Sequence, residues 1–126
     1  MKLSTKQQIF TLNIAKLILK ANEMGILLTF GDAFRTQDQQ YLYYKGLTFI
    51  KGMLAKVSRK SWTMDGQHLK RLAVDFNHFL NGGADLTYKK EYLQELGDYW
   101  ESLHPDNRWG GNFKKTIDTP HYEMRD

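Results

Sequence analysis

Two histidines and two aspartates lie in segments whose composition suits metal-assisted hydrolysis. His68 precedes Asp75 by seven residues, and His121 lies in the segment 118–123, with the sequence DTPHYE. Two histidines and one carboxylate are a common ligand set of catalytic zinc sites, which leaves the fourth position open for water. Zinc lowers the pKa of water, so hydrolysis is the chemistry this set would support. A single histidine is nevertheless more often a surface or core residue than a ligand, and this alternative stays open here.

A hydrolytic metal site also needs a base that takes a proton from water and passes it to the leaving group. Asp118 is the candidate, because it lies three residues before His121 yet need not bind the metal itself. Pro120 fixes its own φ and restricts Thr119 to extended conformations, so the segment is expected to be stiff.

A strand predicted at residues 72–79 must position Asp75. The segment is apolar apart from Asp75, Asn77 and His78. A carboxylate buried in such a strand needs a partner, which favours the metal site. Because successive side chains point to opposite faces of a strand, His78 points away from Asp75 and is left out of the site.

Two helices are predicted before this strand. Apolar residues at helical spacing predict a helix over 5–24, beginning at a capping box with Ser4 at its N-cap and ending at Gly25. A second capping box at 36–39 begins a helix that runs to about residue 45, with Gly46 after it.

The remaining elements complete an α+β pattern. A third helix is predicted over 88–103, with one apolar face formed by Tyr92, Leu96, Tyr99 and Leu103. Further short strands are predicted at 26–30, 108–109 and 121–124. Residues 46–67 are expected to form a long basic loop with a short helix near 49–55. The pattern predicts one α+β domain over residues 1–126, with a short antiparallel sheet packed against helices.

Length and composition exclude several classes of protein. The chain has 126 residues, a mass of 14.8 kDa and no cysteine, which excludes disulfides, thiol catalysis and cysteine-ligated metals. No apolar run approaches the ~20 residues of a membrane span. Polar residues interrupt the apolar run near the N-terminus, which makes it a poor signal peptide. We therefore expect synthesis in the cytoplasm without a signal peptide.

The net charge of +4 is unevenly distributed. Residues 45–71 contain seven basic residues and one acidic residue. Such a stretch is typical either of a solvated face or of contact with a polyanion, such as an anionic cell envelope or nucleic acid. A non-catalytic nucleic-acid-binding domain would use this stretch with the aromatic residues Tyr41, Tyr43, Tyr44, Phe49 and Trp62.

Four motifs, in order along the chain, resemble those of a known peptidase family. The pattern Ser-x-His-x-x-Gly-x-Ala-x-Asp is similar to residues 66–75, where Gly66 replaces the serine and Arg71 replaces the glycine. The pattern Asp-x-Pro-His-Phe-Glu is similar to residues 118–123, with tyrosine for phenylalanine. A Trp-Gly-Gly motif is present at 109–111, followed by Phe113. A Tyr-Arg-Ser/Thr motif with a downstream glutamine resembles residues 34–36 with Gln40.

The family comprises small zinc peptidases, the D-alanyl-D-alanine carboxypeptidases and L-alanyl-D-glutamate endopeptidases, and includes many phage endolysins. The resemblance implies a Zn²⁺ cofactor held by His68, Asp75 and His121, with Asp118 as the general base. It also implies that Arg35 contacts the substrate or the developing oxyanion. The alternative for Arg35 is a surface salt bridge to a neighbouring aspartate.

Glu123 is not one of the predicted ligands, but it is a candidate for supporting one of them. Glu123 shares a strand face with His121, so it either orients that ligand or lies exposed on the strand. The two departures at Gly66 and Arg71 remove neither a ligand nor the base, so we expect an active enzyme.

The leading hypothesis is a zinc metallopeptidase, endolysin-like, that hydrolyses the L-alanyl-D-glutamate bond of the peptidoglycan stem peptide. A D,D-carboxypeptidase is the alternative. A degenerate peptidase that serves only as a binding module is a third possibility, and the presence of Asp118 argues against it. We expect action on the cell wall as a monomer, with no separate wall-binding domain, no membrane span and no nucleic-acid partner.

Overall fold

The computed structural model of the chain describes residues 1–61 and 66–126. Its main sheet is antiparallel, with the order β1-β4-β7-β6 and with β5 paired to the outer part of β4. The strands of this sheet are β1 (Leu27–Phe30), β4 (Ala73–Leu80), β5 (Asp85–Thr87), β6 (Asn107–Trp109) and β7 (His121–Met124). The predicted α+β class and the predicted strands are confirmed.

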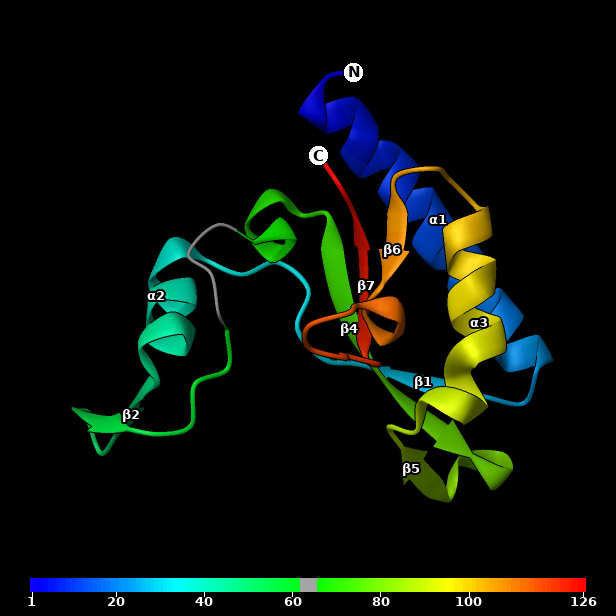
Figure 1. Cartoon of the computed structure of the whole chain (residues 1–126). Helices are drawn as coiled ribbons and strands as arrows, with labels where there is room; N and C mark the ends of the chain where they lie inside the picture. Colours follow the sequence, from blue (N-terminus) through cyan, green and yellow to red (C-terminus); the bar gives the residue numbers. More distant parts are fainter. Residues whose placement is uncertain (62–65) are drawn as a thin grey trace.

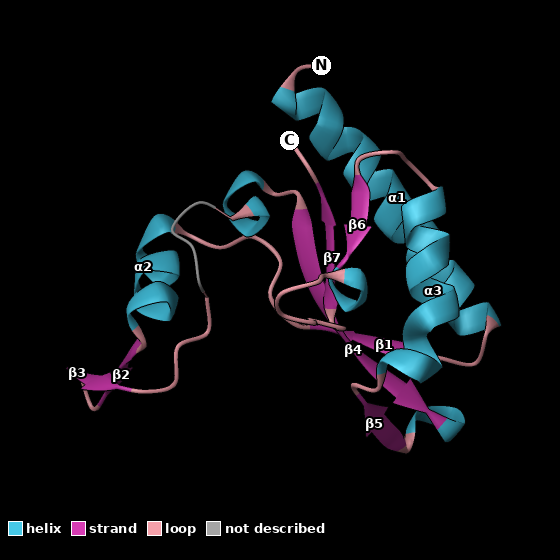
Figure 2. Ribbon diagram, viewed as in Figure 1, coloured by secondary structure: helices cyan, strands magenta, loops and turns pink. Residues whose placement is uncertain are grey.

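Two helices, α1 (Leu3–Glu23) and α3 (Lys90–Ser102), cover one face of the sheet (Figures 1 and 2). Between the helices and the sheet lies a core that includes Phe10, Leu17, Val74, Phe76, Leu93, Leu96, Trp100, Trp109 and Tyr122. The opposite face of β4 and β7 is not covered by these helices. No helix of the described part of the chain has the length and hydropathy needed to cross a membrane.

The structure corrects two details of the helix predictions. Ser4 is not the N-cap of α1, because the helix begins at Leu3 with Lys2 at the N-cap and no side-chain cap. Instead, Lys6 Nζ donates to Asp106 Oδ2 at 3.2 Å and so holds the first turn against the rest of the chain. In α3 the buried residues are Leu93, Leu96, Gly97 and Trp100, whereas the predicted Tyr92 lies in solvent.

The segment after α2 (Gln37–Lys45) differs from its prediction. The caps of α2 are confirmed, since Thr36 Oγ1 accepts from Gln39 N at 3.2 Å and Gly46 takes the left-handed conformation. The basic loop expected next contains the antiparallel hairpin of β2 (Leu47–Ile50) and β3 (Met53–Lys56), and no helix near 49–55. Lys51 and Gly52 connect the strands with positive φ at both positions, the geometry of a two-residue type I′ turn.

Trp109 connects the helical layer to the loop that precedes β7. Its ring lies against Gly97 of α3, where an added Cβ would approach Cε3 to 2.1 Å. Its indole Nε1 donates to Thr119 O at 2.8 Å. The absence of a side chain at Gly97 therefore allows a fully buried tryptophan to hold the segment that contains Asp118 and His121.

Gly97→Ala is expected to lower the free energy of unfolding by ~1–3 kcal/mol, because overpacking displaces the Trp109 ring. Chemical denaturation monitored by circular dichroism measures this change. The exposed neighbour Glu95→Ala is the control, expected to change stability by no more than ~0.5 kcal/mol. A stabilisation by ~1 kcal/mol, the gain in helix propensity from glycine to alanine, would contradict the close packing.

Candidate metal centre and cleft

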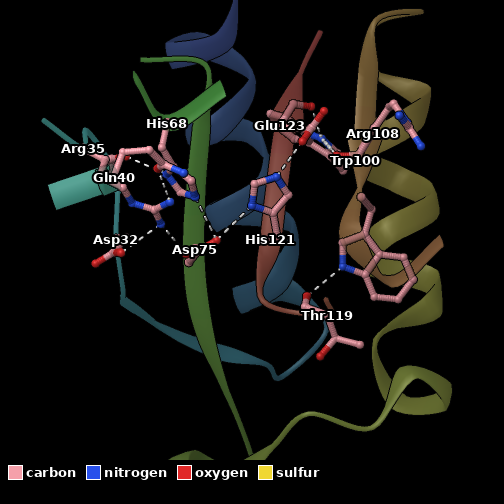
Figure 3. A network of polar contacts seen from close by, with 12 residues as sticks. Asp32, Arg35, Gln40, His68, Asp75, Trp100, Arg108, Thr119, His121 and Glu123 are labelled. Carbon is pink, nitrogen blue, oxygen red and sulfur yellow. Dashed lines mark hydrogen bonds and ion pairs between the residues drawn. The ribbon is translucent and has the colours of Figure 1, made fainter. Parts of the chain in front are cut away.

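The site is built on the face of the sheet opposite the two helices (Figure 3). In the antiparallel register of β4 and β7, Asp75 lies directly opposite His121. Their side chains meet, with 3.1 Å between Asp75 Oδ1 and His121 Nδ1. Because side chains alternate along a strand, Glu123 shares this face, and its Oε1 lies 2.7 Å from His121 Nε2.

His68 comes to the same place from the short 3-10 turn Gln67–Lys70 that leads into β4. Its Nδ1 lies 2.7 Å from Ala33 O, which accepts a hydrogen bond when Nδ1 carries the proton. Its Nε2 then points to Asp75 Oδ1 at 3.4 Å. One ligand atom from each of His68, Asp75 and His121 lies within 4.8 Å of the other two. The three predicted ligands are therefore brought together.

The surroundings of the three residues suit a bound cation. Each histidine has one ring nitrogen at the Asp75 carboxylate and the other held by an outer acceptor, which fixes the ring as in zinc sites. Burial by itself would lower the pKa of His121, but the hydrogen bonds to Asp75 and Glu123 raise it to about 9. Burial would likewise raise the pKa of Asp75, but hydrogen bonds from the two histidines lower it well below its usual range. The site thus stabilises positive charge among these residues.

A cavity of about 280 Å³ opens beside the three candidate ligands. Asp118 and Arg35 both line this cavity, as Glu123 does. Asp118 keeps contact with solvent, yet partial burial and the nearby charge of Asp75 raise its pKa above the usual value, against the opposing effect of His121. A carboxylate with a raised pKa at the cavity wall is suited to proton transfer.

Arg35 lies in the cleft and is anchored from two sides. Its Nη1 donates to Gln40 Oε1 at 2.9 Å and its Nη2 to Asp32 Oδ2 at 3.0 Å. The guanidinium also lies over the Tyr43 ring, with 4.7 Å to the ring centre. Arg35 therefore pairs with a neighbouring aspartate, but only 10% of its side chain is exposed, so this is a salt bridge at the cavity wall and not on the surface.

Gln40 is a residue of the site to which the sequence assigned no role. It is fully buried, and while it accepts from Arg35 its Nε2 donates to Ser61 Oγ at 2.6 Å. The sequence did point to it, because Gln40 is the glutamine downstream of the motif at residues 34–36, and its buried amide requires the partners seen here.

The other residues singled out in the sequence lie at the edges of this site or away from it. His78 points away from Asp75 as predicted, and it is buried, where its Nε2 lies 2.7 Å from Tyr122 Oη and burial lowers its pKa to about 4. Arg71 takes the left-handed conformation, with φ 56° and ψ 37°, and lies over the Phe34 ring rather than in the cavity. Phe113 forms part of the cavity wall.

Among the aromatic residues predicted for a nucleic-acid surface, those that the structure describes do not form one platform. The Tyr43 ring is covered by Arg35 and approached by Lys60, and the Tyr44 ring by Lys45 and Arg59. The side chains of Tyr41 and Phe49 lie exposed. Trp62 lies outside the described residues.

Comparisons with known proteins agree with the motifs. The model of the family described as D-alanyl-D-alanine carboxypeptidase matches residues 59–124. The structure is similar to that of the L-Ala D-Glu endopeptidase ChiX of Serratia marcescens, with a TM-score of 0.62 and 17% sequence identity over 88% of this chain and 77% of that chain. At this identity the likeness concerns the fold. No curated protein matches the sequence.

The contact from Glu123 to His121 leads to a test of metal affinity. Glu123→Gln removes the charge that fixes the His121 ring, so zinc is expected to bind about 10- to 100-fold more weakly. Competition with a chromophoric chelator measures the dissociation constant. Glu95→Gln, on the exposed side of α3, is the matched control and should leave zinc affinity unchanged. Equal affinities of the two variants would show that Glu123 does not support the ligand.

Proposed function

The chain belongs to the D-alanyl-D-alanine carboxypeptidase family of peptidases, and from this we propose that it is a zinc-dependent peptidase that hydrolyses the L-alanyl-D-glutamate bond of the peptidoglycan stem peptide. The observation that carries the proposal is the group of His68, Asp75 and His121 at the base of a cavity that also contains Asp118. An endolysin-like role in breaking down the cell wall follows from this substrate.

The three grouped residues would hold zinc through one nitrogen of each histidine and a carboxylate oxygen. When bound, zinc supplies Lewis acidity, which polarises a carbonyl group and makes water more acidic. The protein contributes the orientation, because Ala33 O fixes the His68 ring and Glu123 fixes the His121 ring. The cavity leaves the open side of the group accessible to a peptide.

Asp118 carries the proton in the proposed reaction. Its carboxylate takes a proton from the attacking water and returns it to the nitrogen of the leaving amine. Asp118 suits this exchange by its place on the cavity wall beside the grouped residues, where partial burial raises its pKa and so favours proton acceptance. The ligand Asp75, whose pKa is lowered, is the poorer base of the two.

Arg35 orients the peptide in this proposal. A guanidinium has five N–H donors, and Gln40 and Asp32 accept one from each terminal nitrogen. Further N–H groups therefore stay available for the scissile carbonyl or the developing oxyanion. Buried Gln40 keeps the guanidinium fixed while the substrate binds.

The shape of the cleft supports an endopeptidase. The central cavity shares Phe113, Thr116 and Glu123 with one neighbouring cavity, and Arg35, Lys60, Asp75 and Asp118 with another. The cleft thus continues on two sides of the candidate metal site, which accommodates a chain passing through. A D-alanyl-D-alanine carboxypeptidase is the second candidate, because Arg35 and Lys60 line the central cavity and could bind a terminal carboxylate.

Digestion of purified peptidoglycan tests the choice of bond. The proposal expects fragments with a new N-terminal glutamate and a new C-terminal alanine on the sugar-linked part, identified by mass spectrometry. Release of free alanine from the peptide end would instead establish the carboxypeptidase. Intact stem peptides after treatment with zinc-loaded protein would refute both.

The different tasks of the two aspartates lead to a further prediction. Asp118→Asn keeps the size of the side chain but removes its basicity, so zinc should stay bound while hydrolysis slows by about 10²-fold or more. Asp75→Asn removes an anionic ligand, so zinc binding itself should weaken. Zinc content and hydrolysis rate are measured on the same preparations.

The exposed Asp98→Asn is the control for both variants and should match the original protein in both measurements. Loss of zinc in Asp118→Asn with retention in Asp75→Asn would show that the two roles are reversed. Full activity of zinc-loaded Asp118→Asn would show that another residue is the base.

A further inference from the structure

The hairpin of β2 and β3 projects, together with α2, away from the main sheet and its helices (Figures 1 and 2). Its base is attached to the end of α2, where Val57 N donates to Gly46 O at 2.8 Å. Its two strands pair with each other and, among the described residues, with no other strand. Such a hairpin is marginally stable in water by itself, so exposed apolar residues on it call for an explanation.

The tip of the hairpin is apolar and lies in solvent. The exposed fractions of its four large apolar residues are 61% for Phe49, 54% for Ile50, 74% for Met53 and 57% for Leu54. In the register of the hairpin Phe49 lies opposite Leu54, and Ile50 lies opposite Met53. Because opposite residues share a face and neighbours alternate, one pair lies on each face of the tip. A flat partner could cover only one of these faces, whereas insertion into a fluid apolar phase would cover both.

The apolar tip lies within a cationic segment. Residues 47–56, the two strands and their turn, contain two basic residues and no acidic one. Lys51 is at the turn itself and Lys56 ends β3, and both are exposed. Neither forms an ion pair with any residue in the described part of the chain. This charge complements a surface that is negative, and it opposes the approach of a second copy of the same segment.

We propose that the tip of the β2–β3 hairpin, residues 49–54, is a membrane-docking element that inserts into the interfacial region of bilayers containing anionic phospholipid. The four apolar side chains would leave water on both faces, while Lys51 and Lys56 meet the negative head groups. The protein would then lie on the membrane surface, held there by the inserted tip. The inference rests on the hairpin alone and does not depend on the peptidase activity.

Vesicle flotation with the full chain tests the proposal. The protein is expected to float with vesicles of equal parts phosphatidylglycerol and phosphatidylcholine, and to remain unbound with phosphatidylcholine alone. Ile50→Thr combined with Met53→Thr should weaken binding by about tenfold or more, since each buried apolar side chain contributes strongly. Lys51→Gln and Lys56→Gln should each weaken it about fivefold, the effect of one cation near an anionic surface.

The control variants remove exposed apolar or basic side chains that lie outside the hairpin. Leu12 and Leu19 on α1 are similarly exposed, at 59% and 71%, so Leu12→Gln combined with Leu19→Gln should leave binding unchanged. Lys16→Gln and Lys90→Gln are the controls for charge. Absence of binding to the anionic vesicles, or binding that the hairpin variants and the controls affect equally, would overturn the proposal.

A spectroscopic readout avoids dependence on disruptive variants. The chain has no cysteine, so Met53→Cys can be labelled at one position with an environment-sensitive fluorophore. Its emission should shift to the blue with the anionic vesicles, whereas the label at Leu19→Cys should not respond. An unchanged spectrum at position 53 in protein that floats would refute insertion. A chain that is dimeric in solution, and becomes monomeric on Ile50→Thr, would identify a second copy as the partner of the tip instead.

Discussion

The pairing of Asp75 with His121 across β4 and β7 is the contact on which the site depends. It joins residues 46 positions apart in the sequence, and the core on the other face of the same strands determines it. Val74, Phe76 and Tyr122 are buried against the helices, so a shift of one residue in register would turn them to solvent and turn Asp75 into the core. The hydrophobic core therefore fixes the geometry of the polar site, and no contact within the site has to do so alone.

A second constraint holds the segment that carries Asp118. Asp118 N donates to Gly110 O at 2.9 Å, and Phe76 N donates to Pro120 O at 2.9 Å. A side chain at Gly110 would collide with Asp118 O at 2.1 Å, so only glycine permits this close approach. The Trp-Gly-Gly sequence thus has a structural explanation, because the tryptophan anchors the segment and the glycine makes space for it.

Predictions from the sequence succeeded where contacts within a single element determine its structure. The caps of α2 are an example, since Thr36 and Gly46 act within the helix they bound. The predicted start of α1 was wrong, because the helix begins at Leu3 with no side-chain cap, and the contact from Lys6 to Asp106 that holds its first turn is one that no local pattern contains. The hairpin was missed because its turn carries lysine at a position where asparagine or glycine is the usual signal, and Gly52 alone is weak evidence.

In the site, too, sequence motifs identified the main residues, whereas the contacts that hold them form only in the folded chain. The motifs around His68, Asp75 and His121 predicted residues that the fold does bring together. The acceptor for His68 is the backbone carbonyl of Ala33, and no side-chain pattern can reveal a carbonyl. The role of Gln40 likewise depends on Arg35 and Ser61, which meet only in the folded chain.

Residue 71 illustrates how a departure from a family motif can be explained physically. The family has glycine where this chain has Arg71, and the backbone there is left-handed, the conformation that glycine adopts at least cost. Arginine tolerates this conformation here while its guanidinium lies 4.1 Å from the centre of the Phe34 ring. The substitution thus places a cation beside an aromatic ring rather than in the cleft.

The fold divides the basic stretch of the sequence into parts with separate surroundings. Lys51 and Lys56 lie on the exposed hairpin, whereas Lys60 lines the candidate active site, and Lys70 pairs with Asp126 at 3.3 Å. These cations have different contacts, because Lys60 lies over the Tyr43 ring and Lys70 pairs with Asp126. The number of basic residues in this stretch is therefore larger than the number that any one partner would contact. The cations of the hairpin and of the cleft have to be explained separately, by what each group can contact.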